Sequence, residues 1–407
     1  MSTGLFNTSQ LTQDLAKKSF ASMITRLMPN GSAPLFGITS MLETETAVAT
    51  EHGFFTKTLL LPQMQLTGTQ AVGDTTFTVG STANVLVGML MRVNNTGENI
   101  IVNSVLSSTQ IAVTRAVGTT VATATGTTSF LYQVGNAYEE ASIRPNALQI
   151  NPVRITNLTQ IFRNTWGISE SIRATQMIAG DTNIAESRQD CAAFHAIMIE
   201  QALIFGQKSQ STRNGQPFRT MDGGISIISN AANYPALYAG VPNTTVFGAT
   251  TNYTQFEAAV DPMFNQTTDP KVANERVLFV GGIAKKVINN IGRLNGTYYM
   301  VDGQTSWGLQ FSTIKTARGT FRIIEHPLLN TNPTWQSYAL GLDLSTFRIA
   351  YLGDRRTQNK EFNMDDAEAV DNGIDAVGGT LTTECTCVMK NPPANFFGTT
   401  LTAAAAG

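Results

Sequence analysis

Apolar residues recur at helical spacing most clearly between Ile184 and Gly206. From Cys191 onward they cover most of the helix circumference, which predicts a long helix buried on several sides. Residues 11–28 predict a shorter amphipathic helix that ends before a Pro- and Gly-containing linker. The apolar stripe of this helix consists of Leu11, Leu15, Ile24 and Leu27 or Met28. Residues 275–295 predict a strand, a Gly-Gly turn and a third helix.

Between about residues 64 and 136 the pattern changes to short β-rich runs. Turns rich in Gly, Asn, Ser and Thr separate five predicted strands. Five strands are enough for a barrel or sandwich of roughly 70 residues, near the lower size limit for independent folding. The segment holds no His, no Cys and almost no acidic residues. We interpret it as an inserted interaction module without chemistry of its own.

The remaining segments predict extended chain, loops and strands. Residues 34–63 and 147–169 are expected to be extended, and residues 207–250, rich in Gly, Asn and Ser, are expected to be loops. Further strands are predicted at residues 319–326, 337–344, 346–352 and 380–389. The predicted class is α+β, with several antiparallel strands, one long central helix and one β insertion.

The low content of charged residues excludes some classes of function but does not identify one. Charged residues make up 14% of the chain, against about 25% in a typical soluble protein. Surfaces that meet other proteins would explain this, and an uncharged Thr- and Asn-rich β surface explains it equally well. The formal net charge of −2 gives no basic field of the kind that marks nucleic-acid binders. We find neither the apolar core of a signal peptide nor the roughly 18 apolar residues of a membrane span.

Cys191 and His195 are four residues apart and share one face of the predicted long helix. A Cys–His nucleophile needs a depressed thiol pKa, exposure and an orienting third group, and a zinc site needs about four ligands. The surrounding helix is predominantly apolar, so we interpret the pair as packing residues, with redox or metal roles as alternatives. Cys385 and Cys387 are expected on opposite faces of a strand, and all three thiols are expected to be reduced.

No other segment carries a complete motif for catalysis, a cofactor or a metal. The turn at residues 280–286 lacks both Gly-rich nucleotide-binding patterns. Residues 361–379 are acidic and lack Lys and Arg, but they do not fit a calcium loop and are expected to be a solvated surface loop. His52 and His326 have no carboxylate at an informative spacing. We therefore expect no catalytic residues, no cofactor and no metal.

The order of the predicted elements resembles the tailed-phage major capsid protein of the Hong Kong ninety-seven type fold, which encapsulins share. Several stretches resemble the SU-ten-like podovirus group, among them "NPVRITNLTQIFRNTWGISESIRA" and "ESRQDCAAFHAIMIEQALIFGQKS". The second stretch corresponds to the spine helix of that fold, with Glu200 near its end. "RVLFVGGIAKKVINNIGRL", "TFRIAYLGDR" and "GGTLTTECTCVMKNPPANFFG" resemble axial-domain and closing segments, where Glu384 takes the place of a recurrent acidic residue.

The resemblance implies a phage major capsid fold whose β insertion lies in the extended loop. The implied parts are an N-terminal arm (1–36), an extended loop (37–63 and 137–165), a β-barrel or sandwich insertion (64–136), a peripheral domain with the spine helix (166–260), an axial domain with closing strands (261–355), and C-terminal strands with the acidic loop (356–407).

The resemblance also implies a non-enzymatic function. It implies self-assembly into the pentamers and hexamers of an icosahedral head that encloses double-stranded DNA, formed in the cytoplasm of a bacterial host. The expected partners are further copies, scaffolding, portal and decoration proteins, and non-specifically packaged DNA, with no membrane. An encapsulin-like or other virion shell protein and a Cys-dependent enzyme remain alternatives. The candidate inter-subunit contacts are Leu11, Leu15, Ile24, Leu27, Glu51 and Phe54.

Overall fold

The computed structural model describes most of the chain. The described residues are 33–57, 62–127, 129–148, 152–175, 183–234, 242–265, 275–295, 301–306, 309–362 and 375–405. The chain forms two compact units. Unit 1 comprises residues 1–52, 157–229 and 243–407, and unit 2 comprises residues 53–156 and 230–242.

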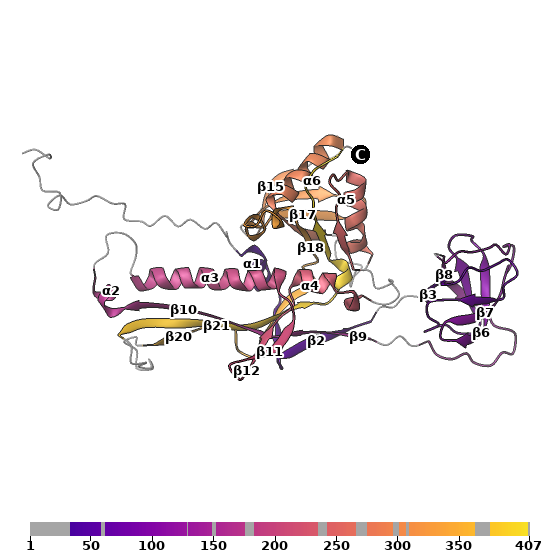
Figure 1. Cartoon of the computed structure of the whole chain (residues 1–407), viewed down its shortest axis with the longest axis horizontal. Coiled ribbons are helices and arrows are strands. Elements are labelled where there is room, and N and C mark those ends of the chain that lie inside the picture. Colours follow the sequence, from indigo (N-terminus) through magenta and orange to yellow (C-terminus); the bar gives the residue numbers. More distant parts are fainter. Residues whose placement is uncertain are drawn as a thin grey trace, which may run out of the picture. The chain divides into compact units, whose positions relative to one another are not determined.

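Unit 1 contains a long mixed sheet with the strand order β1-β19-β21-β10, and β20 also pairs with β21. Its strands are β1 (Glu45–Ala47), β10 (Gln160–Ser169), β19 (Phe347–Leu352), β20 (Gln358–Phe362) and β21 (Ala376–Met389). The long helix α3 (Asn183–Phe205) lies along β10 and β21 (Figure 1). Phe162 and Trp166 of β10 are buried, whereas Ile161 and Arg163 are exposed. One face of this sheet therefore packs on α3, and the other face is exposed at Arg163 but buried at Glu384 and Thr386.

A second sheet of unit 1 has seven strands in the order β13-β22-β18-β14-β17-β16-β15. They are β13 (Thr244–Val246), β14 (Glu275–Val280), β15 (Val301–Ser306), β16 (Leu309–Lys315), β17 (Thr320–Glu325), β18 (Ala339–Leu342) and β22 (Phe396–Thr399). The helices α5 (Tyr253–Val260) and α6 (Gly282–Asn295) pack against it (Figure 1). Short 3-10 turns join these elements: η4 (Asp261–Phe264), η5 (Pro327–Asn330), η6 (Trp335–Ser337) and η7 (Pro392–Ala394).

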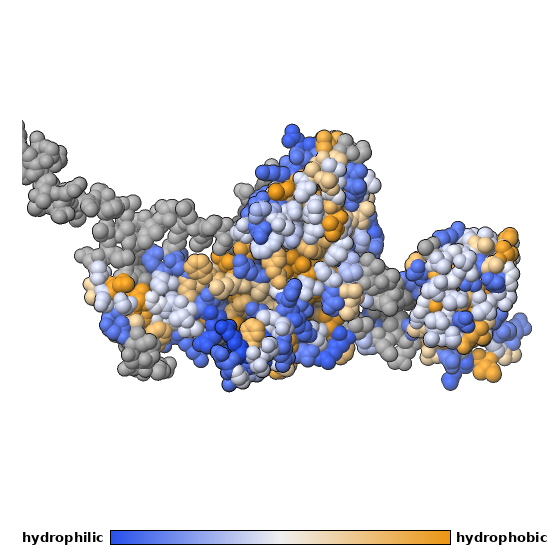
Figure 2. Space-filling model, in the orientation of Figure 1, coloured by the Kyte–Doolittle hydropathy of each residue, from blue (hydrophilic) through white to orange (hydrophobic). Residues whose placement is uncertain are grey.

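Smaller elements surround the ends of α3. The helix α1 (Pro34–Met41) packs near its C-terminal half, and α2 (Glu170–Ala174) follows β10. The strands β11 (Ser209–Arg213) and β12 (Gln216–Thr220) form an antiparallel hairpin, which α4 (Gly224–Ser229) follows. Figure 2 shows hydrophilic residues gathered over β11 and β12, which agrees with the exposure of every residue of β11.

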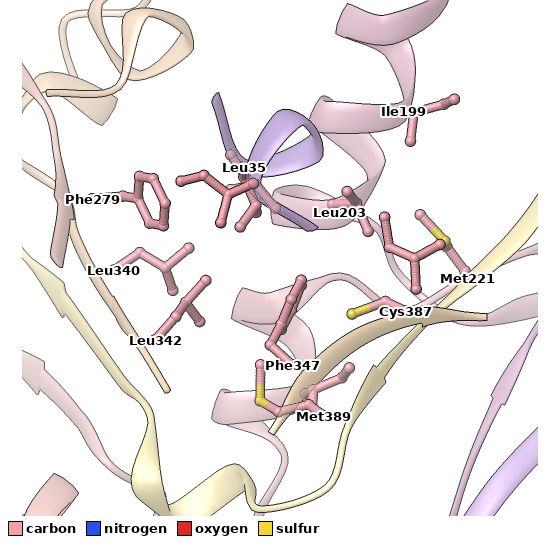
Figure 3. Packing of buried hydrophobic residues seen from close by; sticks show 14 of the residues in the cluster. Leu35, Ile199, Leu203, Met221, Phe279, Leu340, Leu342, Phe347, Cys387 and Met389 are labelled. Atoms are coloured by element: carbon pink, nitrogen blue, oxygen red, sulfur yellow. The ribbon is translucent and has the colours of Figure 1, made fainter. Parts of the chain in front are cut away.

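The main core of unit 1 joins helices and both sheets. Leu203 of α3 packs in one cluster with Leu35 of α1, Leu340 of β18 and Phe347 of β19. Figure 3 shows Cys387 of β21 among these side chains. Burying apolar side chains of this size contributes about 1.5–3 kcal/mol each before entropy is counted. This packing therefore positions the C-terminal part of α3. The prediction that the helix is buried on several sides was wrong, because Phe194 and Met198 are 56% and 47% exposed.

Unit 2 has its own six-stranded sheet, in the order β3-β8-β5-β6-β7-β4. The strands are β3 (Gln63–Gln65), β4 (Thr76–Thr78), β5 (Met89–Val93), β6 (Asn99–Ser107), β7 (Gln110–Thr114) and β8 (Phe130–Asn136). The short turn η2 (Ala231–Asn233) also belongs to this unit. The alternating side chains of the strands bury a separate apolar core that includes Leu66, Phe77, Met91 and Leu131. Unit 2 therefore does not share its core with unit 1.

The two strands that precede and follow the six-stranded sheet in sequence pair with each other. They are β2 (Glu51–Thr56) and β9 (Val153–Leu158), which form a two-stranded sheet. A Cβ atom at Gly53 would lie 2.5 Å from the carbonyl oxygen of Ile155. This separation is too short for any side chain, so the close approach of the backbones requires glycine here.

The structure confirms the α+β class and the long helix, and it corrects several local predictions. Residues 34–41 are helical rather than extended, and residues 207–250 contain a hairpin, α4 and β13 instead of loops alone. The sheet of unit 2 has a sixth strand, β3, because the short segment at Gln63 pairs along β8. The prediction for Cys385 and Cys387 was wrong. Residues two apart on a strand share a face, and both thiols lie in the same core cluster.

Candidate functional site

Cys191 and His195 are both buried, at 7% and 3% exposure. Cys191 packs with Trp166 and Leu381, and burial raises the pKa of its thiol. Both ring nitrogens of His195 have hydrogen-bonding partners, Nδ1 at 2.8 Å from Asn164 Oδ1 and Nε2 at 2.7 Å from Thr383 Oγ1. Neither nitrogen is left to take a proton from a thiol. The predicted packing role is confirmed.

His326 pairs with a carboxylate that no sequence spacing indicates. Its Nε2 lies 2.6 Å from Oε1 of Glu200, 126 residues away, and neither side chain is exposed. Charged groups are costly to bury unless they are paired and hydrogen-bonded. This pair connects α3 to the start of η5, next to the second sheet. The buried carboxylate thus ties the long helix to the seven-stranded sheet of unit 1.

The same carboxylate also caps α1. The backbone N–H groups of Leu35 and Phe36 donate to Glu200 Oε1 at 2.8 Å and to Oε2 at 2.6 Å. The N-cap residue, Ala33, makes no side-chain cap, and Pro34 occupies the first turn. A negative charge at a helix N-terminus is favourable because the unpaired N–H groups point toward it. Glu200 therefore holds the N-terminal end of α1 against α3.

Glu384 is a second buried carboxylate with several partners. It lies on the face of the long sheet that points away from α3. It is 1% exposed and accepts a 2.9 Å hydrogen bond from Thr159 Oγ1. Arg355 Nη1 lies 2.6 Å from Oε2, and Arg219 Nη2 lies 3.6 Å from Oε1. The two arginines come from the turn after β19 and from the β11–β12 hairpin. Glu384 thereby holds the hairpin and this turn against β21.

His52 also has an acidic partner, at the boundary of the β2–β9 sheet. Its Nε2 lies 3.3 Å from Oε2 of Glu45, and Lys390 contacts the other oxygen of Glu45. Burial raises the pKa of Glu45, but the hydrogen bonds and charges of Lys390 and His52 outweigh it and hold that pKa below its usual value. These contacts fix the chain between β1 and β2.

The predicted contact residues are only partly within the described chain. Leu11, Leu15, Ile24 and Leu27 lie outside the described residues. Glu51 is exposed and Phe54 is partly buried on β2. The sequence reasoning missed the neighbouring Phe55, which is 70% exposed. A large aromatic side chain in solvent on a two-stranded sheet is a recognisable mark of an interaction surface.

Among the described residues, no cluster of three or more His, Cys, Asp or Glu side chains is placed to hold a metal ion. No helix in the same residues is both long enough and apolar enough to cross a membrane. The ionisable groups described above instead join elements of the fold to one another.

Comparisons with known proteins identify the family. The family model described as SU10 major capsid protein matches residues 2–402. The major capsid protein of Pseudomonas phage PaMx41 is 34% identical over 397 residues, which cover 96% of this chain and 93% of that protein. This chain belongs to the SU10 major capsid protein family, which confirms the resemblance that the sequence stretches indicated.

Solved structures with lower similarity include the capsid of a GTA particle and an encapsulin. The capsid of a native GTA particle has a TM-score of 0.48 and 10% identity, over 99% of this chain and all of that chain. The SrpI encapsulin complex from Synechococcus elongatus has a TM-score of 0.43 and 10% identity, over 63% of this chain and 81% of that chain.

Proposed function

We propose that this protein is the major capsid protein of a phage, and that it assembles into the pentamers and hexamers of an icosahedral head around double-stranded DNA. The observation that carries the proposal is the 34% identity with a phage major capsid protein over 96% of the chain. Capsid proteins act by association, so many modest interfaces add up through symmetry.

The β2–β9 sheet supports this proposal as an inter-subunit element. A two-stranded sheet is marginal by itself in water, and this one exposes Phe55. Docking on a neighbouring copy would bury that side chain. In this proposal Glu51 and Phe54 of the same strand contact the neighbour, and Leu11, Leu15, Ile24 and Leu27 form the contact face of the N-terminal arm.

The proposed partners follow from the proposed head. They are further copies of the chain, scaffolding, portal and decoration proteins, and packaged DNA bound without sequence preference. The head assembles in the cytoplasm of the host bacterium and becomes the shell of the virion. Unit 2 either clamps a neighbouring copy or decorates the surface. Deleting residues 64–136 tests the clamp, because shells of undiminished stability would contradict it.

Negative-stain microscopy and light scattering of the expressed chain test the proposed function. We expect shells or capsomer rings, and the particle diameter distinguishes a phage head from a small encapsulin shell. The variant Phe55→Ser should abolish these particles while its circular dichroism stays unchanged. Val246→Ser is the matched control, because Val246 is 78% exposed on β13, outside the proposed contact. A chain that stays monomeric and dispersed when concentrated would contradict the proposal.

A further inference from the structure

The face of the long sheet away from α3 is exposed along part of β10 and β20, and it is rich in cations. We refer to it below as the open face. On β21, Thr380, Thr382 and Glu384 alternate with buried residues such as Cys385, so they point to this side. Arg163 of β10 lies opposite Thr382, and Lys360 of β20 lies opposite Thr380. Strand pairing therefore places both cations on the open face.

Charge on this face is unbalanced. Arg219 and Arg355 share a single buried carboxylate, that of Glu384. Arg163 and Lys360 are both exposed. We call the surface formed by Arg163, Arg219, Arg355 and Lys360 the basic sheet face. It presents four cationic side chains against one carboxylate, in a chain whose formal net charge is −2.

The basic sheet face is compact enough to act as one binding surface. Arg163 and Lys360 are separated by the single strand β21, roughly 10 Å across. The hydroxyls of Thr165 on β10 and Thr380 on β21 lie 3.3 Å apart. Long cationic side chains above short hydroxyls leave room for an extended acidic segment. None of these positions carries an aromatic side chain on which a nucleic-acid base could stack.

The chain itself contains a segment of complementary charge. Residues 363–374 include Asp365, Asp366, Glu368 and Asp371 and no Lys or Arg. The segment joins β20 to β21, so it starts from the sheet that carries the basic face. Twelve residues can reach roughly 20 Å out and back, which is enough to leave one molecule and meet another.

We propose that the basic sheet face docks residues 363–374 of a second copy of this chain. This docking rests on the proposed function, because only an assembly places copies side by side. Opposite charges on the two surfaces would steer the encounter and fix its register more than they would add affinity. The contact is then sensitive to salt, since the screening length falls to about 3 Å at 1 M ionic strength.

Charge reversal in two matched variants tests the docking. The face variant is Arg163→Glu with Lys360→Glu, and the segment variant is Asp366→Lys with Glu368→Lys. Each should raise the protein concentration needed for assembly about tenfold, as expected when two favourable charge pairs become repulsive. A mixture of the two should assemble like the wild type, because each face then meets a segment of opposite charge.

Three comparisons complete the test. Lys315→Glu with Arg144→Glu reverses two exposed cations elsewhere and should leave assembly unchanged. The milder Arg163→Gln with Lys360→Gln replaces the face variant if circular dichroism shows that variant to be unfolded. One chain carrying all four reversals should assemble whether the contact is within one molecule or between two. The mixture of the face and segment variants restores opposite charges only between molecules, so it distinguishes the two cases.

The outcomes are distinct. A face variant, charged or neutral, that assembles like the wild type would overturn the docking alone. Rescue in the four-reversal chain without rescue in the mixture would show an internal contact, which also overturns it. A wild-type chain that forms no particles would overturn the proposed function, and the docking with it.

Discussion

Buried ionisable side chains in unit 1 are paired with residues far away in sequence. Glu200 meets His326 and two backbone N–H groups, and Glu384 meets Arg219 and Arg355. Each pairing satisfies a charge that would otherwise be expensive to bury. Such pairs contribute less net stability than their Coulomb energy suggests, but removing one partner leaves an uncompensated buried charge. Single substitutions at these positions should therefore be more damaging than at exposed ion pairs.

His195 should make the stability of the protein depend on pH. Burial lowers the pKa of His195 below its ordinary value of 6.5, so the unfolded state binds a proton more readily than the folded state. The stability from neutral His195 is complete above about pH 6.5 and declines as the pH falls through the folded-state pKa. In His195→Gln, the free energy of unfolding in urea should therefore fall less between about pH 7 and pH 5.5. Thr383→Val keeps the histidine and should keep the slope; equal slopes in all three proteins would refute this role.

The three thiols should be inert in the folded protein. Cys191, Cys385 and Cys387 are all buried, and burial raises the pKa of Cys385 to about 12. The thiolate is the reactive form, so an alkylating reagent at about pH 8 should modify none of them until denaturant is added. Mass spectrometry after timed alkylation measures this directly. Rapid modification of Cys191 in the native state would contradict its burial and would make the Cys-dependent enzyme a candidate again.

At the scale of elements, hydrophobic periodicity predicted those helices and strands whose formation depends on their own segment of sequence. The long helix, the strand and helix of residues 275–295 and most strands of unit 2 follow from periodicity in their own segments. The helix α1 was missed because its cap comes from Glu200, 165 residues away. The partners of His52 and His326 were missed because folding, not spacing, brings their carboxylates close. Phe55 was missed because sequence does not distinguish which of two adjacent aromatics faces solvent.

Glu200→Gln should loosen α1 more than it disturbs α3. The substitution keeps the shape of the side chain but removes the charge and one of its acceptor oxygens, so a cap and the His326 contact weaken together. We expect a loss of about 2 kcal/mol in the free energy of unfolding. Hydrogen exchange should become faster at the amides of Leu35 and Phe36. Gln201→Ala, at an exposed neighbouring position, is the control; unchanged protection of α1 in Glu200→Gln would contradict the capping role.

At the scale of the whole molecule, the separate apolar core of unit 2 implies two folding units. The core of unit 2 contains no residue from unit 1. Inside unit 2, Glu98 is 1% exposed and binds Arg115, whose guanidinium lies 5.1 Å from the centre of the Phe77 ring. Both partners of this ion pair lie in unit 2. Damage to it should therefore remain within unit 2.

Calorimetry of the full chain tests this independence. We expect two thermal transitions, and Glu98→Ala should lower only one of them, by an amount equivalent to about 3 kcal/mol. Glu139→Ala removes an exposed acid of unit 2 and should change neither. If Glu98→Ala lowered both transitions equally, the two units would be one cooperative system.

The first and last strands of unit 2 are neighbours. Gln65 of β3 lies opposite Phe130 of β8, and β2 and β9, which precede and follow the six-stranded sheet, also pair. The polypeptide therefore enters and leaves the six-stranded sheet at adjacent points, whatever sequence lies between them. Recombination could replace this module with a foreign domain whose ends are equally close, while the rest of the gene stays intact. The position is thus a natural site for exchange during evolution and for grafting a chosen protein by design.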